Sequence, residues 1–255
     1  MAKKKTKNQV PAKKSNNLPA VTFESDSGRG FEGADKESFA IPFLSIIQGL
    51  SPQLKKNKTE YIKDAAEGDI FNNVTQELFD KCEVIPVYYD RKFIEWIPRK
   101  QGGGLVQIYD CAEGKALVAE AEIIDFVPYL SNGHEIRDTR MHYVVLLPNF
   151  EYCVIPMQST QLKKSRKWMS IMSNIKFTGT KGKYTPPMYA NVFELTTGEE
   201  SNEKGDWYGW VINRLRVVNS EEYAAAKDFY KMIGSGAVQA DFEKIQSEED
   251  EDVMF

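Results

Sequence analysis

Residues 141–157 read MHYVVLLPNFEYCVIPM, and this stretch decides the fold class. Segments 141–147 and 152–157 are apolar, rich in β-branched and aromatic residues, and joined by the turn-like Pro148–Glu151. Short segments of this composition on either side of a turn predict a pair of antiparallel strands. Further segments of the same kind, separated by charged or glycine-rich turns, lie at 84–89, 93–97, 105–109, 188–196 and 207–218.

Two segments have helical spacing instead. Ser159–Ile175 places Leu162, Met169 and Met172 near one helical face and leaves a cationic remainder. Glu221–Ile233 is alanine-rich and is flanked by Ser220 as a cap and Gly234 as a stop. A short third helix is predicted at 237–245. One helix inserted between two strand pairs favours a mainly β (α+β) fold, and we predict an OB-like Greek-key barrel with extra helices and disordered charged termini.

The charges are sorted along the 255 residues, although the net charge is only −4. Residues 1–14 carry six lysines and no acid, and residues 248–252 are all acidic. Such blocks are typical of disordered interaction tails. We therefore divide the chain into a lysine-rich arm (1–38), an OB-like domain with an N-terminal helical extension (39–235), a short helix or linker (236–246) and an acidic tail (247–255).

The composition excludes several classes of protein. Three separated cysteines, Cys82, Cys111 and Cys153, do not make a disulfide scaffold and fit a reducing compartment. No apolar run approaches the roughly 20 residues of a membrane span. The N-terminal lysines are not followed by the apolar stretch of a signal peptide. We expect a cytoplasmic protein that has no membrane partner.

No catalytic constellation can be assembled from the residues. His134 and His142 are the only histidines, and neither lies in a nucleophile or zinc signature. Gly102–Gly104 lacks the Lys-Ser/Thr of a phosphate loop and reads as a hairpin tip. We predict a protein that is not an enzyme and has no cofactor and no metal. A Mg²⁺-dependent nuclease using Asp64, Glu67 and Asp69 is kept as an alternative.

An acid-free stretch stands out between Glu151 and Glu194. None of its 42 residues is acidic, whereas it holds seven lysines and arginines with aromatic residues between them. Cations that follow phosphates and rings that accept unstacked bases are what single-stranded nucleic acid requires. The alternative without a ligand is that the cations form a solvated helix face and the aromatic residues belong to the core. The residues predicted to bind DNA here are Lys163, Lys164, Arg166, Lys167, Trp168, Lys176, Phe177, Lys181, Lys183 and Tyr184.

Two weaker clusters have the same mixture of cations and rings. One lies at 88–100, where Asp90 and Glu95 offer an alternative in which the cations are simply ion-paired. The other lies at 207–216. Their aromatic residues are equally suited to the core. The DNA-binding residues predicted here are Arg91, Lys92, Trp96, Arg99, Lys100, Trp207 and Trp210.

The last nine residues, Ser247–Phe255, join five acids to an apolar end that carries the terminal carboxylate. An aromatic ring beside a free carboxylate suits C-terminal capture by a partner. The tethered acids would also compete with phosphates for the chain's own cations. A purely solubilising tail is the alternative. The predicted partner-binding residues are Glu248, Glu249, Asp250, Glu251, Asp252 and Phe255.

This acidic tail ending in Phe255 resembles that of bacterial and tailed-phage single-stranded DNA-binding proteins. Segments 39–50, 67–71 and 84–104 are similar to the podovirus type. The resemblance implies a barrel that coats unwound DNA and a tail that recruits polymerase, helicase-primase or recombination enzymes. Val253-Met254 stand where the bacterial pattern has proline before the final phenylalanine.

We therefore predict a phage protein that coats single-stranded DNA without sequence specificity in replication, recombination or repair, in the cytoplasm of the infected host. An RNA-binding or RNA-polymerase-associated regulator is an alternative that uses the same surface. An adaptor whose basic stretch contacts protein is another.

Overall fold

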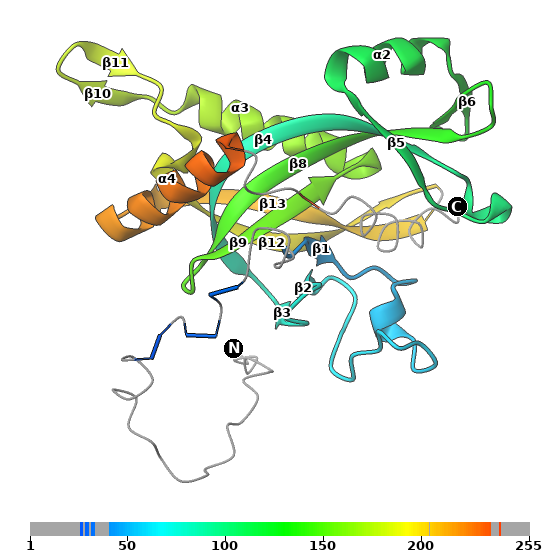
Figure 1. Cartoon of the computed structure of the whole chain (residues 1–255), viewed down its shortest axis with the longest axis horizontal. Coiled ribbons are helices and arrows are strands. Elements are labelled where there is room, and N and C mark those ends of the chain that lie inside the picture. The colour runs from blue at the N-terminus through cyan, green and yellow to red at the C-terminus, as the bar shows by residue number, and fades with distance from the viewer. Residues whose placement is uncertain are drawn as a thin grey trace, which may run out of the picture.

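The computed structural model describes residues 26–27, 29–30, 32–33, 41–203, 205–235 and 240 (Figure 1). The predicted arm, the short helix at 236–246 and the acidic tail lie outside these residues, apart from the turns at 26–33 and Ala240. The helices are α2 (Cys111–Glu120), α3 (Leu162–Asn174) and α4 (Ser220–Gly234), with 3₁₀ turns η2 (Pro52–Leu54), η3 (Arg99–Gln101), η4 (Ser159–Gln161) and η5 (Met188–Ala190).

The strands form three antiparallel sheets. The small sheet holds β1 (Leu44–Ile46), β2 (Ile70–Asn72) and β3 (Leu78–Phe79), and a hairpin is made by β10 (Phe177–Gly179) and β11 (Gly182–Tyr184). The main sheet holds β4 (Cys82–Trp96), β5 (Leu105–Asp110), β6 (Glu122–Ile124), β7 (Val127–Tyr129), β8 (Glu135–Leu147), β9 (Glu151–Met157), β12 (Asn191–Asn202) and β13 (Gly205–Val217).

β4 is the centre of the main sheet, whose order is β13-β12-β4-β8-β7-β6. It pairs with β8 from Glu83↔Leu147 to Trp96↔Glu135, while β9 adds to β8 and β5 adds to β4. The register shifts between Pro86 and Tyr88. Proline has no N–H to donate to a ladder, so within a central strand it is tolerated at such an irregularity.

Both faces of this sheet are buried. Val144 and Leu146 of β8 pack with Trp168 of α3, whereas Tyr143 and Val145 pack on the opposite face, with α4. Successive side chains of a strand point to opposite faces, so a strand covered on both sides is apolar at every position. This explains the unbroken apolar run in the segment that opened the sequence analysis.

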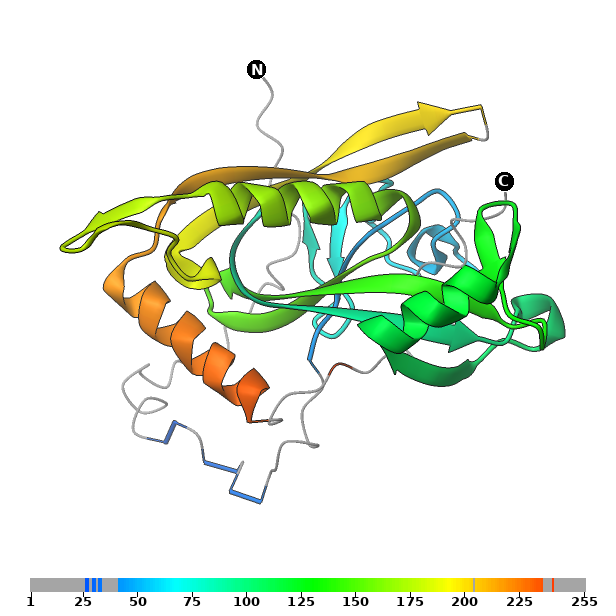
Figure 2. The same ribbon diagram turned by 90° about the horizontal axis from the view of Figure 1, so that it is seen from above.

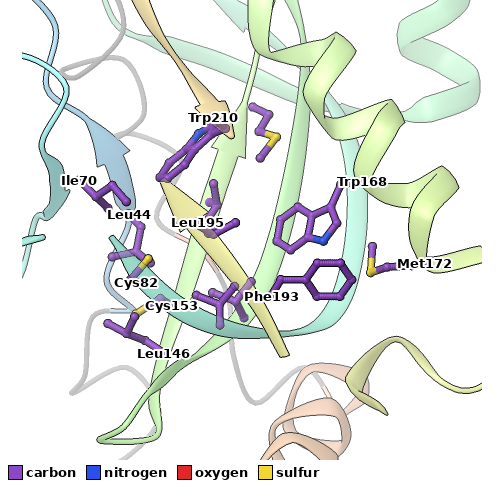
Figure 3. Packing of buried hydrophobic residues seen from close by; sticks show 14 residues of the cluster. Leu44, Ile70, Cys82, Leu146, Cys153, Trp168, Met172, Phe193, Leu195 and Trp210 are labelled. Atoms are coloured by element: carbon purple, nitrogen blue, oxygen red, sulfur yellow. The ribbon is translucent and has the colours of Figure 1, made fainter. Parts of the chain in front are cut away.

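The core on the α3 side contains Trp168, Met172 and Phe193, with Cys153 and Leu195 beside them (Figure 3). Trp168 and Phe193 meet edge to face with ring centroids 5.8 Å apart. Burial of rings of this size contributes a large share of the hydrophobic stabilisation of a small domain. α3 is therefore a structural element as well as a cationic one.

The main sheet does not close on itself by strand pairing in the described residues. Its edge strands β9 and β13 are bridged instead by the segment around β1. Phe43 makes a parallel bridge to Val154, and the Gln48 side chain donates to Tyr208 O at 2.9 Å and accepts from Tyr208 N at 2.8 Å. The mainly β, antiparallel prediction is confirmed, whereas no closed barrel is observed.

The predicted elements are recovered in part. The strands at 141–147, 152–157 and 105–109, the late hairpin and the helices α3 and α4 are confirmed. Segments 84–89 and 93–97 are one strand, because the charged residues between them pair across to β8. The helical extension is wrong, since residues 41–80 form three short strands and one 3₁₀ turn. α2 was not predicted. None of the described helices is long and apolar enough to cross a membrane.

Gly114 of α2 provides a test of this packing. A Cβ at this position would lie 2.3 Å from the Phe93 side chain. Gly114→Ala should therefore lower the free energy of unfolding by about 1–3 kcal/mol through overpacking, although alanine is the better helix former. Urea unfolding measures the change.

Gly234→Ala is the matched control, because nothing lies within 4 Å of its added Cβ. It should change stability by less than about 0.5 kcal/mol. Equal stability of the two variants would show that α2 does not pack on Phe93 as described.

Candidate nucleic-acid interface

The acid-free stretch folds into β9, α3, the β10–β11 hairpin and η5. On α3, Ser165, Trp168 and Met172 are buried against the sheet. Lys163 and the pair Arg166–Lys167 are exposed, and spacings of three and four residues put them on one helical face. Within the described ranges no carboxylate is paired with any of these three cations.

The hairpin that follows α3 extends this surface (Figures 1 and 2). Phe177 pairs with Tyr184 across β10 and β11, and their rings meet edge to face at 6.2 Å. The Tyr184 side chain is 48% exposed. We call the cations and rings of this region the cationic arm; its members, all exposed except the half-buried Phe177, are Lys163, Arg166, Lys167, Lys176, Phe177, Lys181, Lys183 and Tyr184.

Lys176 differs from the other cations of the arm. Its Nζ donates to Ser173 O at 3.0 Å and to Thr185 Oγ1 at 2.5 Å. These bonds join the end of α3 to the segment that follows the hairpin. Lys176 thus ties the hairpin to the helix and keeps its charge, because neither acceptor is a carboxylate.

Lys164 was predicted to bind DNA but is turned to the other side of α3. It forms an ion pair with Glu200 of β12, and Trp207 Nε1 donates to the same carboxylate at 3.2 Å. Lys164 and the half-buried Trp207 are therefore engaged in holding α3 to the β12–β13 hairpin. The carboxylate that pairs with Lys164 comes from outside the acid-free stretch.

Three of the predicted stacking rings belong to the core. Trp168 is 0%, Trp96 3% and Trp210 3% exposed. A base cannot stack on a ring whose faces are covered, so the prediction is wrong for these three tryptophans. For Trp168 the helical spacing to Met172, one turn on, was the available sign that the ring lies on the sheet-facing side.

His142 lies beneath α3, next to Trp168. Its ring stacks on the indole with centroids 4.7 Å apart, and its Nε2 lies 2.8 Å from Ser165 Oγ. Burial, assisted by the nearby Arg140, lowers the pKa of His142 to about 3. The imidazole is therefore neutral at physiological pH and serves as a core residue.

Two of the four cations in the second predicted bank are ion-paired. Arg91 donates to both carboxylate oxygens of Asp138, at 2.8 and 2.7 Å, and this pairing raises its pKa. Lys92 contacts Asp110 at 2.6 Å and Asp90 at 3.6 Å. Arg91 and Lys92 therefore follow the alternative stated in the sequence analysis, in which these cations are ion-paired. Lys100 is exposed, and the side chain of Arg99 lies outside the description.

Glu95 is not a partner of these cations. Its buried carboxylate accepts from Tyr109 at 2.5 Å and Asn132 at 2.9 Å, and lies 2.6 Å from His134 Nδ1. Burial opposes ionisation of Glu95, but these three hydrogen bonds outweigh it and lower the pKa. The bond to Glu95 raises the pKa of Tyr109 to about 12. This polar cluster holds together β4, β5 and the loop before β8.

The carboxylates of the nuclease alternative lie in the loop between η2 and β2. Asp69 accepts from Ala66 N at 2.8 Å, and Asp64 and Glu67 lie nearby in the chain. Among the described residues, no group of three His, Cys, Asp or Glu side chains is placed to hold a metal ion.

The fold and this surface define a mainly β protein with a set of exposed cations on one helix and on the hairpin that follows it. The family model described as "Pam3 phage gp34-like protein" matches residues 12–239. Since this match covers most of the sequence, the chain belongs to the Pam3 phage gp34-like family. No curated protein and no solved structure matches it.

The buried His142 makes stability depend on pH in a defined direction. The unfolded chain binds a proton below about pH 6.5, whereas the folded chain does so only near pH 3. The contribution of the neutral, buried His142 to the free energy of unfolding is therefore present above pH 6.5. It is lost as the pH falls toward 3, by up to about 1.4 kcal/mol per pH unit. His142→Gln should flatten the fall in unfolding free energy between these limits, measured by urea unfolding across pH.

His134→Gln is the control for this experiment, because it removes the other histidine and leaves His142 in place. The wild-type fall should persist in this variant. An unchanged pH profile in His142→Gln would contradict the burial of a neutral imidazole.

Proposed function

We propose that this protein is a non-enzymatic single-stranded DNA-binding protein and that the cationic arm is its phosphate-contacting surface. The observation that carries the proposal is the set of exposed cations Lys163, Arg166 and Lys167 on one face of α3, which have no carboxylate partner among the described residues. Unpaired surface cations retain their full attraction for phosphate, and release of counterions from the nucleic acid drives binding.

The hairpin supports single strands as the form that is bound. Tyr184 is exposed at the end of β11, with Phe177 against it and Lys181 and Lys183 alongside. Rings next to cations accept unstacked bases, whereas a duplex keeps its bases stacked inside. A mixture of this kind favours single strands without reading their sequence.

The strand order supports the OB-like part of the proposal. The strands β9-β8-β4-β12-β13 lie side by side, and α3 lies between the third and the fourth of them in chain order. An OB-fold is a five-stranded, partly open Greek-key barrel that binds oligonucleotides. We propose that the present sheet is an OB-like variant whose opening is spanned by the β1 segment.

The family description supports a phage setting, and we propose that the protein acts in phage DNA replication or recombination in the host cytoplasm. The tail Glu248–Asp252 with Phe255 would then recruit replication or recombination proteins, such as a polymerase or helicase-primase. An aromatic residue that carries the free carboxylate suits capture in a pocket with one apolar and one basic wall.

Neutralising the α3 face tests the proposal. Lys163→Gln/Arg166→Gln/Lys167→Gln should weaken binding of a labelled dT oligomer of about 30 nucleotides by tenfold or more at low salt. It should also reduce the slope of log K against log salt by about 2, at roughly 0.7 per lost contact. Anisotropy of the labelled oligomer is the suitable measurement, because three of the tryptophans are buried.

Lys56→Gln/Lys58→Gln/Lys63→Gln is the matched control. These lysines are also exposed but lie in the loop between η2 and β2, and the variant has the same net charge as the α3 variant. Equal losses in the two variants would mean that net charge, not the α3 face, governs binding. Absence of binding by the wild-type protein at low salt would overturn the proposed function.

Three further samples separate the alternatives in the same assay. Tighter binding of RNA than of DNA would favour the RNA regulator, which would use the 2′-hydroxyl. Equal binding of duplex and single strands would contradict base stacking. Cleavage of the oligomer on addition of Mg²⁺ would favour the nuclease.

Deleting the tail 247–255 tests its two proposed roles. Deletion should tighten binding of the dT oligomer at low salt, because tethered acids compete with phosphates at high effective concentration, and the gain should vanish as salt rises. It should also abolish recruitment of partners. Phe255→Ala should leave DNA affinity unchanged and lose partner docking alone. An affinity that deletion does not alter at any salt would refute self-competition.

A further inference from the structure

Four tyrosines form a connected row on the surface at the α4 end of the molecule. Tyr88 comes from β4, Tyr189 from η5, and Tyr223 and Tyr230 from α4. Ring centroids lie 6.4 Å apart for Tyr88–Tyr230, 5.7 Å for Tyr230–Tyr189 and 5.4 Å for Tyr189–Tyr223. We call these residues the tyrosine row.

Three of the four tyrosines of the row are partly exposed. Tyr88 is 37%, Tyr223 38% and Tyr230 45% exposed, whereas Tyr189 is half-buried between the two α4 tyrosines. Large rings normally bury most of their area in a folded domain. These three partly open aromatic rings, connected directly or through Tyr189, therefore make an apolar surface on which flat groups can pack.

The row is supported from below by core rings. Tyr88 meets Tyr143 edge to face at 5.9 Å, and Tyr143 meets Phe229 in the same way at 6.4 Å. Phe229 is itself fully buried and stacks on Tyr152 at 4.2 Å. Because Tyr88 rests on this packed aromatic layer, its orientation is fixed and little conformational entropy is lost when a ligand stacks on it.

Cations accompany the tyrosines on α4. Lys227 is exposed and lies one turn after Tyr223, with its Nζ 5.9 Å from that ring, and Lys231 follows one turn later. Of the three acids of α4, Glu222 is buried in its pairing with Arg216, Asp228 contacts Lys231, and Glu221 is exposed in the first turn. Among the described residues no carboxylate is paired with Lys227, so this cation beside the Tyr223 ring is available to a phosphate.

The row lies near the cationic arm. Tyr189 follows Tyr184 of the hairpin by five residues in the chain. It also contacts Tyr223 and Tyr230, so that η5 packs on α4. Both views place α4 and the β10–β11 hairpin at the same end of the molecule (Figures 1 and 2). The hairpin thus lies at the end of the molecule that carries the tyrosine row, although α3 and α4 cover opposite faces of the main sheet.

We propose that the tyrosine row is the base-stacking surface of the single-strand site. This inference rests on the proposed function. The tyrosines would stack on the bases in place of the predicted tryptophans, which are buried. Its ligand is a run of unstacked DNA bases, whose phosphates are held by the cationic arm and by Lys227. Stacking of this kind tolerates any base, because every base has a flat face.

The test compares Tyr223→Ala/Tyr230→Ala with Tyr223→Phe/Tyr230→Phe. The alanine pair should weaken binding of the dT oligomer by about tenfold or more for the two lost rings, while the phenylalanine pair stays within about twofold of wild type. The salt dependence should be unchanged in both, because no phosphate contact is removed. Unfolding curves establish that both pairs are folded.

An abasic oligomer of the same length sharpens the result, because it keeps the phosphates and lacks the bases. Wild type should prefer the dT oligomer to the abasic one, and the alanine pair should lose most of that preference. An unchanged preference would overturn the tyrosine row while leaving the proposed function intact, provided that wild type and the α3 variant behave as predicted above.

A second measurement covers the case in which the alanine pair does not fold. An oligomer containing 5-bromodeoxyuridine is crosslinked by light to the wild-type protein, and the linked peptides are identified by mass spectrometry. Crosslinks within 188–190 and 220–234 are expected. Crosslinks confined to other segments, or an alanine pair altered in self-association and not in DNA binding, would refute the proposal and identify the row as a protein interface.

Discussion

The pairing of β4 with β8 is the interaction on which the rest of the structure depends. The two strands pair from Glu83↔Leu147 to Trp96↔Glu135 with one shift of register, and every other strand of the main sheet joins one of them directly or through a neighbour. Because both faces of this pair are covered, the apolar residues of β8 from Met141 to Leu146 alternate between the two cores. α3 and α4 are thereby fixed on opposite faces, which determines where the cationic arm and the tyrosine row lie.

The distribution of ion pairs explains why some cations are available and others are not. Arg91 and Lys92 project from the central strand and find acids on neighbouring strands, where partial burial strengthens the attraction. Lys163, Arg166 and Lys167 project from the outer side of a helix that has no acid of its own. The absence of acids from 152–193 therefore predicts unpaired cations only where the fold also turns the side chain away from other acids. Lys164 lies in the same stretch but is paired with Glu200 of β12.

Local patterns predicted the local features well. The helical spacing in 159–175, the strand pair around Pro148 and the cationic remainder of α3 all follow from composition and period. What failed depended on contacts between distant residues. The charged residues 90–92 are interpreted as a turn until their partners on β8 are known, and tryptophans beside cations are interpreted as stacking rings until their burial is known. The tyrosine row joins β4, η5 and α4, and no single window of sequence contains it.

The side-chain amides of Gln48 and Gln161 both reach the backbone of β13 at Tyr208, and Gln161 also accepts from Trp210 N. An unpaired edge strand is a template on which another sheet can assemble, and natural proteins block such edges in various ways. Here the glutamines occupy the backbone groups of Tyr208 and Trp210 that an incoming strand would need at this point of the edge. The edge of β13 is thus protected against edge-to-edge aggregation at these two residues by side chains from two distant segments of the chain.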